Sequence, residues 1–116
     1  MSKFMESERL LLISSINPQA LQLDIETTLS FYIKEFINNT ELSTIDYKVD
    51  KIDGRNTTNI SPWTSVDMTT SNNDVYSFQY TLSNITASDS ISFTFKVVDI
   101  DGLEYFKTLN DFNIIA

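Results

Sequence analysis

Cysteine and histidine are both missing from this 116-residue chain. Without cysteine, no disulfide can hold the fold and no thiol redox chemistry is available, which favours folding in a reducing cytoplasm. The two absences together exclude Ser-His-Asp and Cys-His nucleophile systems. They also exclude the ordinary zinc sites, which need imidazole or thiolate ligands. No cofactor or metal is therefore expected.

Glycine and long apolar runs are also scarce. With only Gly54 and Gly102, the chain cannot form the glycine-rich loops that cradle phosphates or dinucleotides. The apolar run at residues 10–13 is short and follows acidic residues, so it does not fit a signal peptide. Nothing approaches the roughly 20 apolar residues that cross a bilayer. We therefore expect no signal peptide and no membrane span.

Basic residues are outnumbered: eight Lys and Arg stand against sixteen Asp and Glu, for a net charge of −8. This balance argues against nucleic acid, because binding to phosphates depends on Lys and Arg. It argues equally against anionic membrane surfaces. The excess charge is best explained as a solubility device, although a basic protein surface stays open as a partner.

What the chain does contain is strict alternation of apolar and polar residues. Residues 75–82 and 91–98 alternate with period two, which predicts strands with one buried face. Asp101-Gly102 then predicts a hairpin turn before a strand at residues 103–108. Further strands are predicted at residues 10–16, 21–25, 45–50 and 63–68, with residues 112–115 continuing or closing the sheet.

Residues 29–37 fit two patterns. A strand would put Leu29, Phe31 and Ile33 on one face, whereas a helix would collect Leu29, Tyr32, Ile33 and Phe36. The strand is preferred because its neighbours are β. The chain is thus expected to be all-β, an antiparallel sandwich of seven to eight strands at residues 10–116, preceded by an N-terminal arm at residues 1–9.

These strands resemble immunoglobulin-like and fibronectin-III-like sandwich modules. The resemblance rests on the opening at residues 13–18, the strands at 29–33, 45–50 and 76–82, and the closing strand and turn at 95–102. Free-standing modules of this format look like bacteriophage virion proteins, such as capsid decoration, head-fibre or tail accessory proteins. The resemblance therefore implies a structural protein of the virion, made in the host cytoplasm, that binds capsid or tail subunits. A carbohydrate-binding or adhesion module is the main alternative.

Three residues are candidates for contact with that assembly or ligand. Trp63 is the first, because exposed Trp is enriched at interface hot spots and can stack on sugars, although capping the core is the preferred interpretation. Phe4 and Met5 lie in the N-terminal arm, which is expected to dock on a neighbouring subunit.

The acidic residues offer weaker alternatives. Nominal carboxylate pairs such as Asp24 with Glu26 or Asp46 with Glu35 are expected on solvated faces, so no catalytic residue and no enzyme is predicted. Asp99, Asp101 and Glu104 surround Gly102, but their spacing fails the EF-hand pattern and a hairpin turn explains them better than calcium. Four N-x-Ser/Thr triplets, at Asn38, Asn56, Asn59 and Asn84, are attributed to chance.

Overall fold

A computed structural model describes residues 11–13, 16–35, 42–70, 75–86, 89–110 and 112–115. The predicted arm at residues 1–9, with Phe4 and Met5, lies outside these described residues. The elements follow one another in the order β1 (Leu11–Ile13), β2 (Ala20–Gln22), β3 (Thr27–Glu35), β4 (Leu42–Asp53), β5 (Asn56–Ser65), the 3-10 helix η1 (Met68–Thr70), β6 (Val75–Tyr80), β7 (Ser90–Asp99), β8 (Glu104–Leu109) and β9 (Asn113–Ile115).

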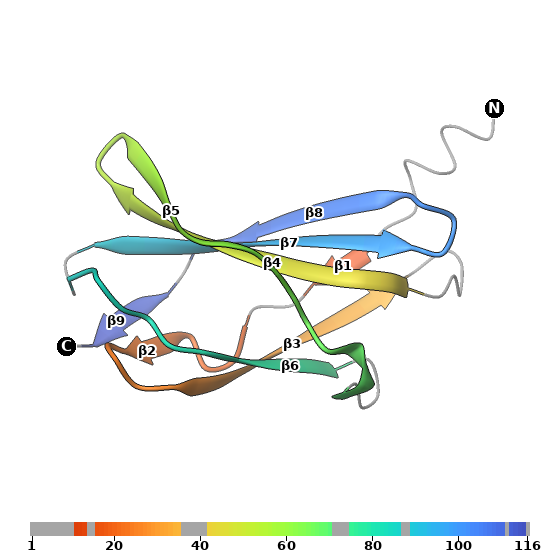
Figure 1. Ribbon diagram of the computed structural model, residues 1–116, viewed down its shortest axis with the longest axis horizontal. Coiled ribbons are helices and arrows are strands. Elements are labelled where there is room, and N and C mark those ends of the chain that lie inside the picture. Colours follow the sequence, from red (N-terminus) through yellow and green to blue (C-terminus); the bar gives the residue numbers. More distant parts are fainter. Residues whose placement is uncertain are drawn as a thin grey trace.

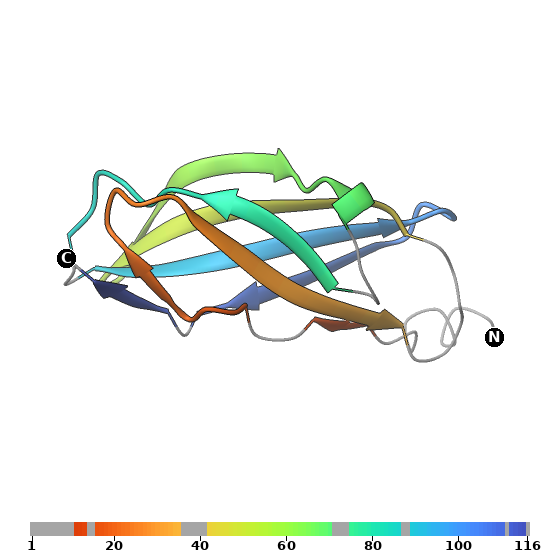
Figure 2. The ribbon, with the colours of Figure 1, turned by 90° about the horizontal axis from the view of Figure 1, so that it is seen from below.

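Two antiparallel sheets form the layers of a β-sandwich. One sheet has the strand order β1-β3-β6 and the other has the order β5-β4-β7-β8. Figure 1 shows the layers edge-on, with β4, β7 and β8 above β3 and β6, and Figure 2 shows β3 and β6 in front of the larger sheet. In each sheet one pair of neighbouring strands comes from distant parts of the chain, since β3 pairs with β6 and β4 pairs with β7. The predicted all-β sandwich is confirmed.

The core lies where the alternating faces of the two sheets meet. On β7, Ile91, Phe93, Phe95 and Val97 are fully buried, as their period-two spacing predicts. The Phe31 ring on β3 lies 4.5 Å from the Phe95 ring across the two layers. Aromatic contacts of this kind combine a large burial of apolar surface with a preferred tilted geometry, so they hold the layers together.

The ambiguous segment is a strand as far as Glu35, and residues 36–37 lie outside the described residues. β3 pairs with β6 over six residues, and Leu29, Phe31 and Ile33 are all buried on its inner face. A helix would have broken the hydrogen bonds to β6, and these long-range bonds override the local helical spacing. The preference for a strand is confirmed by this pairing.

The described residues form nine strands, beside the predicted seven to eight. The difference arises at the C-terminal segment, where β9 does not continue β8. Instead, β9 runs parallel to β2, and the Asn113 N–H donates to the Gln19 carbonyl at 2.9 Å. This short parallel pair ties an early segment of the chain to the last strand.

Strand β5 also differs from the prediction, which placed a strand at residues 63–68. The observed strand starts seven residues earlier and pairs with β4 from Asn56 to Ser65. All ten of its residues are exposed or half-buried, so the strand has no apolar alternation by which it could be recognised. Hydrogen bonds to β4, interrupted by two register shifts near Val49, hold it in place.

Candidate functional site

Four side chains form a band across the outer face of the large sheet, one from each strand. They are Trp63 on β5, Lys48 on β4, Lys96 on β7 and Phe106 on β8. Strand alternation places them there, because the neighbours of each lysine along its strand are buried in the core. We call these four residues the aromatic–lysine band.

The band is held together by ring contacts. The Trp63 and Phe106 ring centroids are 6.3 Å apart in an edge-to-face arrangement. The ammonium groups of Lys48 and Lys96 lie 5.4 and 5.3 Å from the Trp63 ring centroid, which is cation–π distance. Trp63 remains 42% exposed and Phe106 59% exposed, so the band presents two aromatic rings and two cations to solvent.

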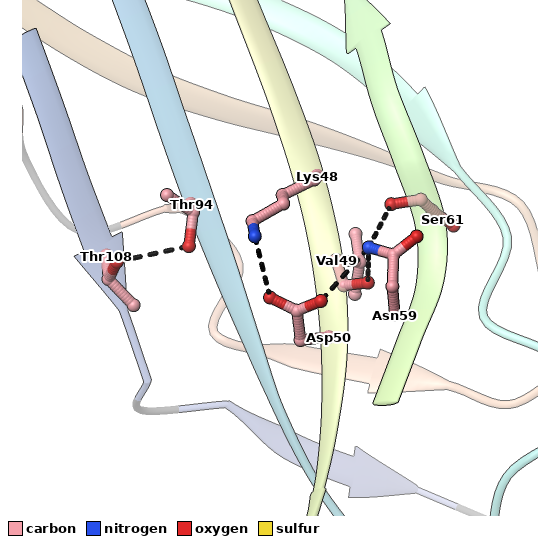
Figure 3. A network of polar contacts seen from close by, with 7 residues as sticks. All are labelled: Lys48, Val49, Asp50, Asn59, Ser61, Thr94 and Thr108. Atoms are coloured by element: carbon pink, nitrogen blue, oxygen red, sulfur yellow. Dashed lines mark hydrogen bonds and ion pairs between the residues drawn. The ribbon is translucent and has the colours of Figure 1, made fainter. Parts of the chain in front are cut away.

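A polar network underlies one end of the band (Figure 3). The Lys48 ammonium lies 3.6 Å from an Asp50 carboxylate oxygen, and Asp50 is buried. The Asn59 side-chain amide donates to the other Asp50 oxygen at 3.0 Å and to the Val49 carbonyl at 3.2 Å. The same amide reaches the Ser61 carbonyl at 2.9 Å. Asn59 thus satisfies the backbone where the pairing of β4 and β5 shifts, and Asp50 fixes Lys48 below Trp63.

The structure corrects the preferred interpretation of Trp63. Trp63 does not cap the core and is not among the residues packed against it. Its strand lies at the edge of the sheet, and its ring lies on the solvent side among charged and aromatic neighbours. The alternative interpretation of Trp63, as an exposed contact candidate, is the one compatible with its position. The two other candidates, Phe4 and Met5, lie outside the described residues.

A second feature is an open cavity at the side of the sandwich, between the edge strands β5 and β6. Its volume is about 420 Å³. Aromatic rings of Tyr47 and Phe78, stacked with centroids 4.3 Å apart, take part in its lining. The other six lining residues all carry hydroxyl, amide or carboxylate groups, and they are Thr28, Thr64, Ser65, Asp67, Ser77 and Gln79.

Three ionisable groups beside the cavity have shifted pKa values. Burial raises the pKa of Tyr47, and the neighbouring Tyr80 raises it further, although a hydrogen bond with Thr64 opposes the shift. Burial also raises the pKa of Tyr80, whose hydroxyl lies 2.7 Å from the Ser61 hydroxyl. Hydrogen bonds from the Thr69 hydroxyl and backbone N–H lower the pKa of Asp67. Both tyrosine side chains therefore stay protonated to a higher pH than an ordinary tyrosine does.

The acidic group around Gly102 forms the β7–β8 turn. The Asp99 carboxylate is almost fully buried and accepts hydrogen bonds from the backbone N–H groups of Asp101 and Leu103. The Tyr105 hydroxyl donates to its second oxygen at 3.3 Å. This is the hairpin-turn chemistry that the sequence favoured over calcium. Within the described ranges, no three acidic side chains converge as a metal site would require.

The aspartate of each nominal carboxylate pair accepts a hydrogen bond from a serine. Asp24 accepts a hydrogen bond from the Ser83 hydroxyl at 2.9 Å, and Asp46 accepts one from Ser65 at 3.1 Å. Both interactions lie on exposed surface. In the part of the chain that the structure covers, no helix has the length and apolar character needed to span a membrane.

Comparison with known proteins gives a fold and no family. No family model and no curated protein matches the sequence. Among solved structures, Spo0M, a sporulation control protein from Bacillus subtilis, aligns with a TM-score of 0.54 at 8% identity over 91% of this chain. The chain spans about half of that protein, 49% of its length. A superoxide reductase (neelaredoxin) from Ignicoccus hospitalis aligns with a TM-score of 0.50 at 10% identity, over 91% of this chain and 80% of the reductase. At such identities the likeness shows the fold alone.

Proposed function

We propose that this chain is a non-enzymatic binding module that attaches to a larger protein assembly through the aromatic–lysine band. The observation that carries the proposal is the pair of exposed rings, Trp63 and Phe106, held in contact on the outer face of a sheet. Exposed aromatic clusters rimmed by charge are typical of protein interfaces, where Trp is the most enriched hot-spot residue.

The lysines give the band a defined electrostatic preference. Asp50 already balances Lys48, but within the described residues no carboxylate pairs with Lys96. A complementary partner would place an acidic side chain against Lys96. It would also place an apolar group between the Trp63 and Phe106 rings of the band. The band is thus a local cationic site on a chain whose net charge is −8.

The assembly that we propose is a bacteriophage particle, in which the chain is a capsid decoration or tail accessory protein. The resemblance to free-standing immunoglobulin-like virion modules supports this choice, as does a small sandwich with an exposed attachment face. On this proposal, the protein reaches the virion through binding alone, and no bond is broken.

The test is co-sedimentation with the proposed assembly. Lysate from the native source is separated on a density gradient, and each fraction is quantified by mass spectrometry. We expect the protein with large particles, at a fixed ratio to a major capsid or tail subunit. Recovery only near the top of the gradient, as a free small protein, would remove the virion from the proposal.

The contribution of the band is tested with variants of the purified protein. Trp63→Ala is expected to weaken attachment to the particles by about 30-fold, because hot-spot truncations cost about 2 kcal/mol or more. Ile25→Ala is the matched control, since Ile25 is also an exposed apolar residue but lies in the turn before β3. Equal attachment of the Trp63→Ala and Ile25→Ala proteins, with both folded, would exclude the band.

A carbohydrate-binding function is the second candidate, because Trp63 is an exposed ring on a sheet face. The inclination of 62° between the Trp63 and Phe106 rings does not form one flat platform for successive sugars, so this function ranks second. Glycan-array binding that Trp63→Ala abolishes, with particle attachment intact, would reverse the ranking.

A further inference from the structure

We propose that the free edge of β6 is a second binding site, which accepts an extended, basic peptide segment of a partner protein as an added strand. This site lies on the side of the sandwich, across β5 from the aromatic–lysine band, and it stands independently of the proposed function. Strand addition uses backbone hydrogen bonds for affinity and side-chain pockets for specificity.

The pairing of β3 shows which backbone groups of β6 are available. The N–H and C=O of Ser30 both bond to Asn17, at 2.9 and 2.8 Å, on the far side of β3. The backbone groups of Leu29 and Phe31 must then point toward β6, where their partners are Phe78 and Tyr76.

Ser77 and Gln79 alternate with those partners along β6. Their N–H and C=O groups therefore point away from β3, toward the other edge of β6. Among the described strands, β6 pairs only with β3. This edge therefore offers two donors and two acceptors at the spacing of an antiparallel or parallel neighbour.

The 420 Å³ cavity lies along the same edge, and both Ser77 and Gln79 line it. At one end, the hydrogen bond between the Ser61 and Tyr80 hydroxyls joins β5 to β6. Thr64 and Ser65 lie opposite on β5, and the Tyr47 and Phe78 rings provide apolar surface within the cavity. An added strand would thus place one side chain against these rings while its backbone pairs with β6.

The negative charge of this chain favours a basic peptide at the β6 edge. Among the described residues that line the cavity, Asp67 is the one with a charge, and it is exposed directly before η1. Its lowered pKa keeps it ionised, so a Lys or Arg of the incoming segment would find an anion beside the groove. The net charge of −8 adds long-range attraction for a basic segment.

The experiment is a selection from a random peptide library on the folded protein, followed by affinity measurement for the enriched peptides. We expect extended sequences that carry Lys or Arg. Gln79→Pro should lower the affinity for these peptides by about tenfold or more, because proline removes the N–H at the edge of β6 and obstructs the added strand. Gln79→Thr retains the N–H and is the matched control, expected to bind within about twofold of the original chain. Proline on an unpaired edge leaves the β3 pairing intact.

Two further measurements keep the test decisive if Gln79→Pro does not fold. Peptide binding should slow hydrogen exchange at the Ser77 and Gln79 amides of the unmodified protein, and leave Lys96 unaffected. Asp67→Asn should lower the affinity for the basic peptides several-fold and reduce the salt dependence of their binding.

Several outcomes would overturn the assignment. The first is a selection that enriches no peptide, and the second is enriched peptides that bind Gln79→Pro as well as Gln79→Thr. Peptides that depend on Trp63 would belong to the aromatic–lysine band instead. A dimer of the chain that Gln79→Pro dissociates, or an oligosaccharide that occupies the groove, would replace the peptide with another ligand. Failure here leaves the sedimentation test of the proposed function untouched.

Discussion

At the scale of single residues, Asp50 organises the polar side of the large sheet. Its carboxylate is only 8% exposed, yet it lies on the outer face, where it holds both Lys48 and Asn59. A buried carboxylate is stable only when it is paired and hydrogen-bonded, and Asp50 has both kinds of partner. Lys48 of the aromatic–lysine band is thereby oriented before any partner binds.

Removal of this carboxylate should be costly. Asp50→Ala is expected to lower the free energy of unfolding by about 1–3 kcal/mol, because the Asn59 amide and the Lys48 ammonium both lose an acceptor. Urea denaturation measures the change. Asp46→Ala is the control, since Asp46 accepts from Ser65 on exposed surface, and it should change stability by less than about 0.5 kcal/mol. Equal losses for the two variants would contradict the role given to Asp50.

The residues of the candidate site were only partly predictable. Trp63 was identifiable because a lone Trp in a polar stretch is chemically conspicuous. Lys48, Lys96 and Phe106 were not identified, because strand pairing brings them together from positions far apart in the chain. No local pattern carries the register between β4, β7 and β8, so the band could be recognised only once that register was known.

At the scale of elements, the β7–β8 hairpin depends on one side chain. Asp99 ends β7 and accepts from two backbone N–H groups within the turn, while Gly102 adopts a φ of +86° that favours glycine. The turn thus combines an aspartate that bonds to its own loop with a glycine at the strained position.

We expect Asp99→Ala to destabilise the protein by about 2–3 kcal/mol, because it removes a buried carboxylate that accepts from two part-buried backbone N–H groups and the Tyr105 hydroxyl. Thermal melting measures the loss. Asp101→Ala, an exposed change in the same turn, is the matched control. Because the Asp99 carboxylate serves the turn, added calcium should leave the melting temperature of the unmodified protein unchanged, and a clear increase would revive the metal site.

The elements themselves were predictable where one face is buried. The strands at residues 75–82 and 91–98 were found within two residues of β6 and β7, because their buried faces impose period two. β5 was misplaced because all of its residues are exposed or half-buried, so its pairing to β4 leaves no period-two pattern in the sequence. The segment at residues 113–115 was recognised as β, but its parallel partner β2 lies more than 90 residues earlier, which no local signal shows.

At the scale of the whole molecule, the buried phenol of Tyr47 and the half-buried phenol of Tyr80 make stability depend on pH in the alkaline range. The pKa values of Tyr47 and Tyr80 are raised in the folded state, so folding favours their neutral forms. Their contribution is fully present below the ordinary tyrosine pKa of about 10 and is lost as the pH rises through the raised values. The melting temperature should therefore fall above about pH 10 through this effect.

The check is a series of thermal melts from about pH 8 to about pH 11. The double variant Tyr47→Phe with Tyr80→Phe is expected to show a shallower fall than the original chain, because it cannot lose these protons. Identical slopes for the two proteins would show that other groups control alkaline unfolding.

The parallel pair of β2 and β9 has a mechanical consequence. It joins the first part of the domain to its last strand, and backbone bonds such as Leu23 N–H to Ile115 C=O, at 2.8 Å, run along it. A pull on the two ends of this pair in opposite directions slides the strands past each other, so all of its hydrogen bonds bear the load together. A hairpin pulled from its open end would instead release its bonds one at a time. The β2–β9 pair would therefore resist such a pull in shear.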